Sequence, residues 1–462
     1  MTKIAIIGAG PAGLGAAYIL AGKADVTIFE QGKSALERKC PNLKKCVHCN
    51  KRGGLCDKLE GVGGAGANAD GKFLGETLLG EREIGSNMLE YVQSRKRERE
   101  LIINGMNFFQ GYGVNPLSFG KDMMERAGEI EKIARINDMG YIVSRQAHVG
   151  TDKLPELIRG IEKDLSAKGV KIITGEKIET FNDHEIIGEK GSYPYDSLIV
   201  TSGRKGADWL EKVLKENNIR IDYREIDVGF RIETDAAVIK TLCDVSRDVK
   251  LSMRVPGNGD LIRTFCACPN GMVTRETYER AGFNLVNGAS DSNPEKQTQN
   301  SNFALLLSIP LTHRANCNKY ADAIAKTFYW AGTDQPVIQR LGELKADRRS
   351  KKEKLSEFRI KPTLEDAYFG DIGLAMPYRI VRSLLYGIEK LSVPGLMEGL
   401  NQDSTLLYAP ELKRNGLRIP ANEYLKVKEK VYIAGDGPGI TRGIVAAAAS
   451  GILAAEGILK EL

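Results

Sequence analysis

Several features typical of extracellular, fibrous or nucleic-acid-binding proteins are scarce in this sequence. Its 462 residues include only 8 cysteines, 2 tryptophans and 4 histidines. Eight cysteines are too few for a disulfide scaffold in a chain of this length, so we expect a cytoplasmic protein. The formal charge is only +6, from 66 Lys and Arg against 60 Asp and Glu, and we therefore expect no nucleic-acid partner.

Long uncharged hydrophobic runs are also missing. The most apolar stretch, residues 440–459, contains Arg442 and Glu456, which favours a buried helix over a membrane span. We expect no membrane partner. An apolar run follows Lys3, but the glycines after it and the lack of a cleavage site argue against a signal peptide, so we take the mature chain to begin at Met1.

Glycine, in contrast, is abundant, with 50 residues. A β-branched run at residues 3–7 is followed by Gly-Ala-Gly-Pro-Ala-Gly at 8–13, a helical pattern, and a second strand-like run at 25–30. In this βαβ arrangement, glycines let the backbone N–H groups of a helix N-terminus approach a dinucleotide pyrophosphate, and an acid ending the second strand accepts ribose hydroxyls. The predicted dinucleotide-binding residues are Gly8, Gly10, Ala12, Gly13 and Glu30.

A second glycine-rich turn distinguishes FAD from NAD. It follows the strand-like run 430–434 and precedes the last helix. A carboxylate here can bind a ribityl hydroxyl, and the helix N-terminus can face the flavin pyrimidine, where negative charge develops on reduction. The predicted flavin-binding residues of this turn are Gly435, Asp436, Gly443 and Ile444.

Two further stretches are expected beside the flavin. The loop 61–66 reads Gly-Val-Gly-Gly-Ala-Gly, and we expect Gly64 and Gly66 to contact the cofactor because glycine permits close backbone approach. Thr201-Ser202-Gly203 follows a strand-like run at 197–201.

Five stretches carry a resemblance to a known family. They are G-A-G-P-A-G at 8–13, G-V-G-G-A-G-A-N-A-D-G-K at 61–72, R-Q-A-H-V-G-T-D at 145–152, R-T-F-C-A-C-P-N-G at 263–271, and G-D-G-P-G-I-T-R-G-I-V-A-A-A-A-S-G at 435–451. The sequence resembles the flavoproteins with two dinucleotide-binding domains, and within them the FAD-dependent dehydrogenases, or NAD(P)/FAD-dependent oxidoreductases. The resemblance implies FAD and a return to the FAD domain near Gly203, and it names no substrate.

The expected fold class is α/β: a doubly wound, Rossmann-like FAD-binding domain with an inserted antiparallel-sheet substrate domain and helical segments. Alternating strand-like patterns at 227–233, 262–268 and 303–309 predict the antiparallel sheet. We expect residues 1–205 and 400–462 to form the FAD domain and residues 206–399 to form the substrate or cap domain. A small-molecule substrate would enter between them.

Four cysteines, Cys40, Cys46, Cys49 and Cys56, fall in one basic segment. Four thiolates suit an iron-sulfur cluster or zinc, and nearby lysines favour deprotonation. The segment leads directly into the loop 61–66, where an electron relay would serve a flavin, so we favour a [4Fe-4S] cluster over zinc. A redox disulfide between Cys46 and Cys49 and plain reduced thiols remain alternatives.

Three residues are candidates for catalysis. Cys266 and Cys268 lie two apart in a predicted strand, so their side chains would share one face of the sheet. They would face the flavin or pack as small apolar residues. His148 would exchange a proton with substrate while the flavin exchanges hydride, or would be a structural histidine.

The sequence does not identify the source of the electrons. Residues 140–330 contain no second G-x-G-x-x-G motif, so NAD(P)H would dock transiently or an electron-carrier protein would supply electrons. The leading hypothesis is an FAD-dependent oxidoreductase. The alternatives are a dithiol-disulfide oxidoreductase using Cys46 and Cys49, a flavin-dependent RNA-modifying enzyme using the basic runs at 95–99 and 348–354, and a dissociation-inhibitor-like binding protein.

Overall fold

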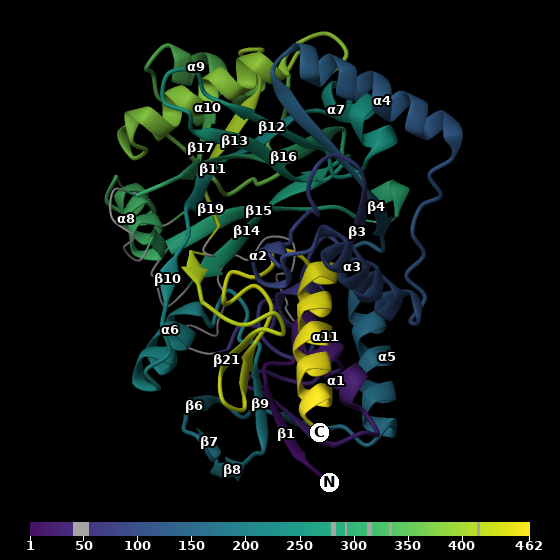
Figure 1. Cartoon of the computed structure of the whole chain (residues 1–462). Coiled ribbons are helices and arrows are strands. Elements are labelled where there is room, and N and C mark those ends of the chain that lie inside the picture. The colour runs from purple at the N-terminus through teal and green to yellow at the C-terminus, as the bar shows by residue number, and fades with distance from the viewer. Residues whose placement is uncertain are drawn as a thin grey trace.

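The computed structural model describes residues 1–39, 55–278, 283–291, 293–311, 317–331, 335–357, 359–413 and 416–462. Within these residues, most strands belong to one of two sheets, one in the lower and one in the upper part of Figure 1. We call the six-stranded sheet the N-terminal sheet and the nine-stranded sheet the large sheet. None of the described helices is long and apolar enough to cross a membrane.

The N-terminal sheet is built from both ends of the chain. Its neighbouring strands are parallel except for β21 at one edge. Its central strands are apolar and buried, as expected where helices cover a parallel sheet. In order across the sheet, the strands are β21 (Lys426–Lys428), β22 (Val431–Ile433), β9 (Ser197–Val200), β1 (Lys3–Ile7), β2 (Asp25–Glu30) and β5 (Lys171–Thr174).

Helices α1 (Pro11–Leu20) and α11 (Ile444–Glu461) lie side by side next to this sheet, so the two termini are close together (Figure 1). Small residues make the close contact possible. A Cβ on Gly451 would lie 1.9 Å from the Ala12 carbonyl oxygen, and one on Gly15 would lie 2.7 Å from the Ala448 carbonyl oxygen. Helix α3 (Arg95–Gln110) packs on the other side of α11, again through a glycine, Gly105.

The large sheet is antiparallel except where β17 meets β18. Its central strand β11 pairs with β16 along its whole length, from Ile226 opposite Ile309 to Asp235 opposite Asn300. In order, the strands are β18 (Tyr368–Phe369), β17 (Val337–Arg340), β19 (Leu406–Lys413), β11 (Ile226–Asp235), β16 (Asn300–Ile309), β13 (Leu261–Cys268), β12 (Lys250–Arg254), β4 (Met139–His148) and β3 (Lys72–Leu79).

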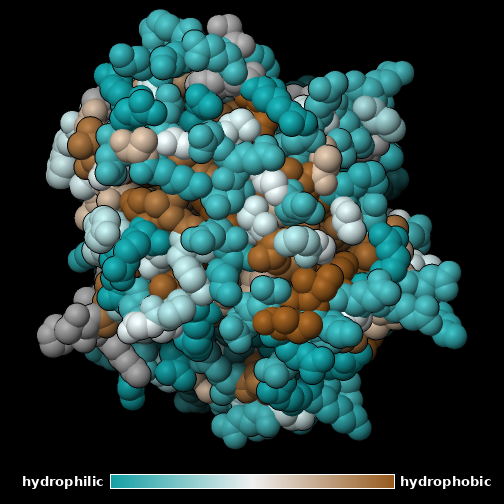
Figure 2. All heavy atoms as spheres, turned by 90° about the horizontal axis from the view of Figure 1, so that it is seen from above, coloured by the Kyte–Doolittle hydropathy of each residue, from teal (hydrophilic) through white to brown (hydrophobic). Residues whose placement is uncertain are grey.

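Helices cover the upper end of the large sheet and share one apolar core with it. Figure 2 shows this end from outside, with a mainly hydrophilic surface and a few hydrophobic patches. The helices at this end are α4 (Lys121–Ile136), α7 (Ala236–Val245), α9 (Leu341–Lys345) and α10 (Tyr378–Leu391). Helix α8 (Cys317–Trp330) packs on the same core from the side of the sheet, where it contacts β11 and β19.

The other α-helices in the described part of the chain are α2 (Leu89–Val92), α5 (Leu154–Ala167) and α6 (Ala207–Glu216). Among the other strands, one small sheet consists of β6 (Ile178–Phe181), β7 (Glu185–Gly188) and β8 (Ser192–Pro194). Two further antiparallel pairs are β10 (Asp222–Tyr223) with β20 (Leu417–Arg418), and β14 (Met272–Tyr278) with β15 (Phe283–Ala289).

The predicted fold class is confirmed: a Rossmann-like parallel sheet is combined with an antiparallel one. Strand β4 pairs with β12 on one side and with β3 on the other. Both β3 and β4 lie in the large sheet although their residues fall within the range 1–205. The substrate-side sheet thus includes two strands from the range expected for the FAD domain.

Candidate functional site

The turn after β1 brings the backbone of α1 close to β9. Gly8 has φ of +100°, and a Cβ there would lie 2.5 Å from the Thr201 carbonyl oxygen. A Cβ on Gly13 would lie 2.0 Å from the Gly8 carbonyl oxygen, whereas one on Gly10 would meet nothing within 4 Å. Gly10 is the N-cap of α1, and no side chain caps it. The helix N-terminus is therefore open to a ligand on the side of Gly10.

Glu30 connects this turn to the loop 61–66. Its carboxylate accepts hydrogen bonds from the backbone N–H groups of Ala9 at 2.9 Å, Gly32 at 2.9 Å and Gly61 at 3.0 Å. A carboxylate offers about four lone-pair sites, so these bonds leave capacity for a ribose hydroxyl. Binding of ribose by Glu30 stays a prediction.

The loop 61–66 lies against the first turn of α1. A Cβ on Gly64 would lie 3.2 Å from Gly10 Cα, and one on Gly66 would lie 3.2 Å from Pro11 Cγ and 3.5 Å from Ile444 Cγ1. Three segments far apart in the sequence therefore meet here: the turns before α1 and α11, and the loop 61–66.

The turn before α11 contains Asp436. Thr441 Oγ1 donates a hydrogen bond of 2.7 Å to Asp436 Oδ1, and Arg204 Nε lies 3.7 Å from Oδ2. Burial raises the pKa of Asp436, although Arg204 and the Thr441 hydrogen bond oppose that shift. Gly443 is the N-cap of α11, again without a side-chain cap.

These segments form one wall of a cavity of about 430 Å³ between the two sheets. The predicted cofactor residues among its lining are Gly10, Ala12, Gly64, Gly66, Gly203, Gly435, Asp436, Gly443 and Ile444. The remaining three, Gly8, Gly13 and Glu30, support this wall from behind through the contacts described above.

The opposite wall comes from the large sheet and is basic. It includes Arg82, Lys250, Arg263, Lys413 and the ring of Phe265. The Phe265 ring has Lys250 Nζ and Lys413 Nζ each 5.0 Å from its centre and Arg263 Cζ at 5.2 Å. These contacts are in the range of cation-π interactions.

Guanidinium groups from both walls meet at one carboxylate, that of Asp227. Arg442 Nη1 lies 2.9 Å from Asp227 Oδ2, and Arg263 also pairs with that oxygen. Burial, followed by the charge of Arg263, lowers the pKa of Arg82, and the charge of Asp227 opposes this shift without cancelling it. Burial raises the pKa of Asp227, but Arg263 and Arg442 outweigh it and lower that pKa to about 2.

Both predicted catalytic cysteines lie at this wall. Cys266 lines the cavity, and Cys268 is fully buried directly behind it. Lys72 Nζ lies 3.5 Å from Cys266 Sγ and 3.7 Å from Cys268 Sγ. On the far side, Arg231 Nη2 lies 3.4 Å from Cys268 Sγ.

His148 lies near this cluster, opposite Lys72 in the pairing of β3 with β4. Its Nε2 is 3.2 Å from Ser290 Oγ and 3.7 Å from Asp70 Oδ2. The adjacent Lys72 Nζ is 3.2 Å from the same Asp70 oxygen. His148 is not among the lining residues described for the cavity, so a proton-transfer role stays a prediction.

The sequence did not indicate Lys72, Arg231 or the arginines around Asp227 as site residues. Lys72 ends the stretch 61–72, in which only the glycines form a recognisable motif. Arg231 lies inside an alternating apolar strand, and nothing in a single sequence distinguishes a buried arginine there from an exposed one.

Three of the four predicted metal ligands, Cys40, Cys46 and Cys49, lie outside the described residues. Cys56 is described, and its backbone N–H donates a 2.6 Å hydrogen bond to Glu60 Oε2. Over the ranges that the structure covers, no group of three or more potential metal ligands occurs. The metal site at these four cysteines stays a prediction.

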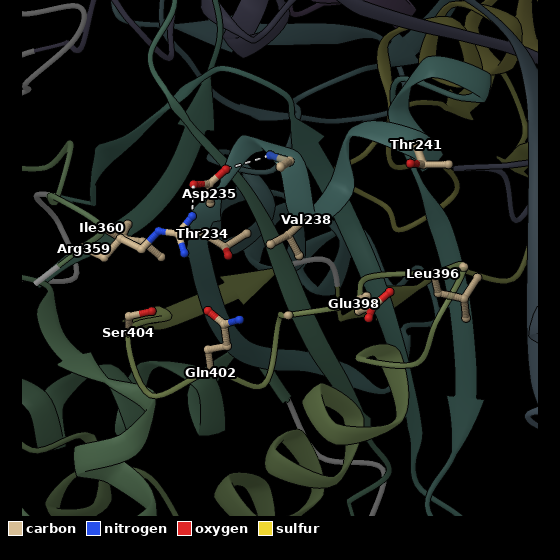
Figure 3. A pocket seen from close by; sticks show the side chains of 13 residues that line it. Thr234, Asp235, Val238, Thr241, Arg359, Ile360, Leu396, Glu398, Gln402 and Ser404 are labelled. Carbon is tan, nitrogen blue, oxygen red and sulfur yellow. Dashed lines mark hydrogen bonds and ion pairs between the residues drawn. The ribbon is translucent and has the colours of Figure 1, made fainter.

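A second cavity, of about 320 Å³, lies at the start of α7, away from this site (Figure 3). Asp235 Oδ1 accepts a 2.9 Å hydrogen bond from the Ala237 N–H, and Oδ2 lies 3.4 Å from Arg359 Nη2. None of the predicted site residues lines it. The first cavity is therefore the candidate functional site.

The residues of the first cavity fit FAD. Gly10 leaves an open cradle at a helix N-terminus, Asp436 offers a carboxylate to a polyol, and α11 points its N-terminus at the same space. The fold and this site agree with the class of FAD-dependent oxidoreductases. Residues 225–414 match the family described as FAD-dependent protein, C-terminal domain-like, and this match confirms the predicted recognition.

The chain is also similar to individual proteins. An uncharacterized protein of Clostridium beijerinckii is 23% identical over 485 aligned positions, covering 99% of this chain and 80% of the relative. Among solved structures, glycine oxidase from Geobacillus kaustophilus is 11% identical with a TM-score of 0.42, covering 100% of this chain and 95% of that chain. Pyridoxine 4-oxidase from Mesorbium loti is 11% identical with a TM-score of 0.42, covering 100% and 99%. Both TM-scores are too low for a detailed comparison.

Proposed function

We propose that the protein exchanges two electrons between FAD and a small anionic molecule, such as a carboxylate, bound against the basic wall of the first cavity. The observation that carries this proposal is the crowding of Arg82, Arg263 and Arg442 around the single carboxylate of Asp227. Bidentate guanidinium groups are well suited to a planar carboxylate.

The charge of the wall supports this choice. Burial and then Arg263, Arg224 and Arg82 lower the pKa of Arg442, with Asp227 acting in the opposite direction. Mutual repulsion among cations is relieved when an anion binds between them. FAD supplies the acceptor for two electrons, while the arginines bind and orient the substrate.

Binding of small carboxylates to the purified flavoprotein tests the proposal. A panel of carboxylates is titrated while the flavin absorption spectrum is recorded. We expect at least one to perturb the spectrum, and Arg263→Gln to weaken its binding about 10- to 100-fold, because a charge-assisted hydrogen bond contributes roughly 1.5–3 kcal/mol. Arg254→Gln is the matched control, because Arg254 is exposed on the neighbouring strand β12. If neutral analogues bind as tightly as carboxylates, the proposal is wrong.

The iron-sulfur cluster at Cys40, Cys46, Cys49 and Cys56 belongs to this proposal as a second part. It is supported by the four-thiol count, the basic surroundings and continuity with the loop 61–66. Anaerobic purification followed by iron and acid-labile sulfide analysis per flavin tests it. Stoichiometric zinc, or no metal, would contradict the cluster and leave the flavin proposal standing.

A third part of the proposal is the electron donor or acceptor. A transiently docked NAD(P)H or an electron-carrier protein would exchange electrons with the flavin. Stopped-flow mixing of the oxidised flavoprotein with NADH or NADPH under anaerobic conditions distinguishes them: bleaching of the flavin supports a nicotinamide, and its absence supports a protein carrier.

A further inference from the structure

Two sulfur atoms and two cations form a compact buried cluster at the wall of the first cavity. Lys72 contacts both Cys266 and Cys268 and also donates to the Ala267 carbonyl oxygen between them. Arg231 Nη2 donates to the Cys266 carbonyl oxygen at 2.9 Å. The two cysteines are therefore held from both sides by fixed cations.

The backbone at the cysteines departs from a regular strand. Residues two apart in an ordinary strand lie about 7 Å from each other. Here the register of β13 against β16 shifts between Phe265 and Cys268, and Cys266 adopts a left-handed φ of +51°. A residue other than glycine seldom adopts this conformation. Cys268 Sγ lies 3.5 Å from the Cys266 carbonyl oxygen, and both sulfurs lie within 3.7 Å of Lys72 Nζ. The bulge therefore brings the two thiols to the same ammonium group.

The two cations favour an anion at the sulfurs. Arg231 is fully buried, and its hydrogen bonds among the described residues go to the Asn302 amide oxygen, the Cys266 carbonyl and the Cys268 sulfur. A buried guanidinium without a hydrogen-bonded carboxylate is costly unless another anion compensates it. The buried carboxylate of Glu411 supplies part of this compensation, and a thiolate at Cys266 adds a second negative charge near the guanidinium.

Gly288 shows how closely the surroundings are fitted to Arg231. A Cβ on Gly288 would lie 1.6 Å from Arg231 Nη2. Gly288 also lines the cavity. The absence of a side chain here gives the guanidinium its place beside the cysteines.

We propose that Cys266 and Cys268 are a redox-active dithiol that exchanges two electrons with the flavin. The proposal rests on FAD binding in the first cavity, as proposed above. In the oxidising direction, the Cys266 thiolate attacks the Cys268 sulfur, an S–S bond forms, and the S–H bond of Cys268 breaks. Two electrons and the Cys268 proton pass to oxidised FAD, which becomes the reduced anion FADH⁻, so charge and atoms balance.

The acid-base state of the pair supports the proposal. A hydrogen bond with Cys268, together with the charges of Lys72 and Arg231, outweighs burial and holds the pKa of the Cys266 thiol well below its usual range. The same hydrogen bond and burial raise the pKa of the Cys268 thiol. One thiolate beside one thiol is the state that thiol-disulfide chemistry requires.

Counting electrons tests the proposal in the intact flavoprotein. The protein is oxidised fully with ferricyanide, desalted, and titrated anaerobically with dithionite while the flavin absorption is followed. We expect the wild type to consume about two more electrons per flavin than Cys268→Ser, because a disulfide is a two-electron couple. Any electrons taken up by the cysteines at 40–56 are common to all variants and cancel in the difference.

Cys317→Ser is the matched control. Cys317 is a buried cysteine on α8, and its Sγ donates to the Arg224 carbonyl oxygen at 2.8 Å, a bond that a serine hydroxyl can replace. We expect its electron count to equal that of the wild type. Equal counts in the wild type and Cys268→Ser would overturn the proposal.

A second measurement does not depend on the flavin. Thiols of the oxidised and reduced protein are trapped with an alkylating reagent, and the peptide containing residues 263–271 is analysed by mass spectrometry. We expect both cysteines to resist alkylation together after oxidation and to react after reduction. If FAD does not bind but the disulfide forms, the proposed function fails and only the electron exchange is lost. If FAD binds and both thiols stay free after oxidation, the dithiol proposal alone is overturned.

Discussion

At the scale of single residues, two side chains have contacts whose loss can be measured. Lys72 holds the two sulfurs of the dithiol, and Asp436 offers its carboxylate to the flavin side of the cavity. Both are held by hydrogen-bonded neighbours, so their removal changes a defined interaction. Their substitutions therefore give separate tests of the two walls.

Lys72→Met should raise the pKa of Cys266, because the ammonium group stabilises the thiolate at 3.5 Å. Each unit of upward shift lowers the thiolate fraction about tenfold at a fixed pH below the pKa. The rate of Cys266 alkylation by iodoacetamide, followed by peptide mass spectrometry from pH 5 to 10, measures the midpoint. Lys72→Arg keeps the charge and should keep the midpoint near that of the wild type. A merely structural lysine would leave the midpoint unmoved in both variants.

Asp436→Ala should weaken FAD binding about 10- to 100-fold, because the cofactor loses a charged hydrogen-bond acceptor of roughly 1.5–3 kcal/mol. Equilibrium binding to the flavin-free protein, followed by flavin fluorescence, measures the change. Asp183→Ala is the control, since Asp183 is an exposed residue that pairs with Lys428. Unchanged affinity in Asp436→Ala would contradict the assignment of this turn to the flavin.

At the scale of elements, the glycines of the first turn have two separate tasks. Gly13 sits where α1 meets its own preceding turn, and a side chain there would collide with backbone. Gly10 faces the cavity, where a side chain meets no protein atom within 4 Å. One glycine therefore serves the packing of the helix and the other serves the ligand.

Gly13→Ala should lower the free energy of unfolding by at least about 1–3 kcal/mol, the usual cost of overpacking. Gly10→Ala should leave stability nearly unchanged and weaken FAD binding, because the new methyl group occupies the space of the pyrophosphate. Thermal unfolding of the flavin-free proteins and FAD titration together separate the two effects. Equal losses of stability in both variants would contradict this division.

At the scale of the whole molecule, Asp227 connects the two walls of the cavity. It lies on β11 of the large sheet and pairs with Arg263 on β13 and with Arg442 in the turn before α11. Ser308 Oγ donates a further hydrogen bond of 2.5 Å to Asp227 Oδ1. The same carboxylate therefore fixes the large sheet to the turn before α11.

The pH dependence of stability follows from the low pKa of Asp227. Despite burial, which raises it, Arg263 and Arg442 lower this pKa to about 2, below an unfolded value of about 3.9. The folded state therefore binds fewer protons, and its extra stability is fully present above about pH 4 and is lost as the pH falls toward 2. Asp227→Asn should remove this dependence and destabilise the protein by about 3 kcal/mol at neutral pH, because two arginines lose their counterion.

Urea unfolding at pH 7, 4 and 3 measures this effect. Asp196→Asn is the control, because Asp196 accepts a hydrogen bond from the exposed backbone N–H of Lys3 and forms no ion pair among the described residues. If Asp227→Asn shows the same loss of stability on acidification as the wild type, another carboxylate is responsible.

The sequence by itself determined the N-terminal sheet and its turns. The strand runs at 3–7 and 25–30 match β1 and β2 residue for residue, because β-branched and apolar residues predominate in both strands and a tight turn to a helix requires glycine. Local composition is sufficient for both features. The family resemblance likewise rested on short motifs that one can read from the chain.

Only the tertiary structure decided which residues share the cavity. Lys72 and Cys266 are 194 positions apart, and Asp227 and Arg442 are 215 positions apart. Their contacts depend on strand order in the large sheet and on a bulge in β13, which are set by pairing between distant segments. A single sequence carries no record of such pairing, because strands of similar pattern can be ordered in many ways. The glycine turns could therefore be predicted from local composition, whereas the basic wall and its dithiol required the folded chain.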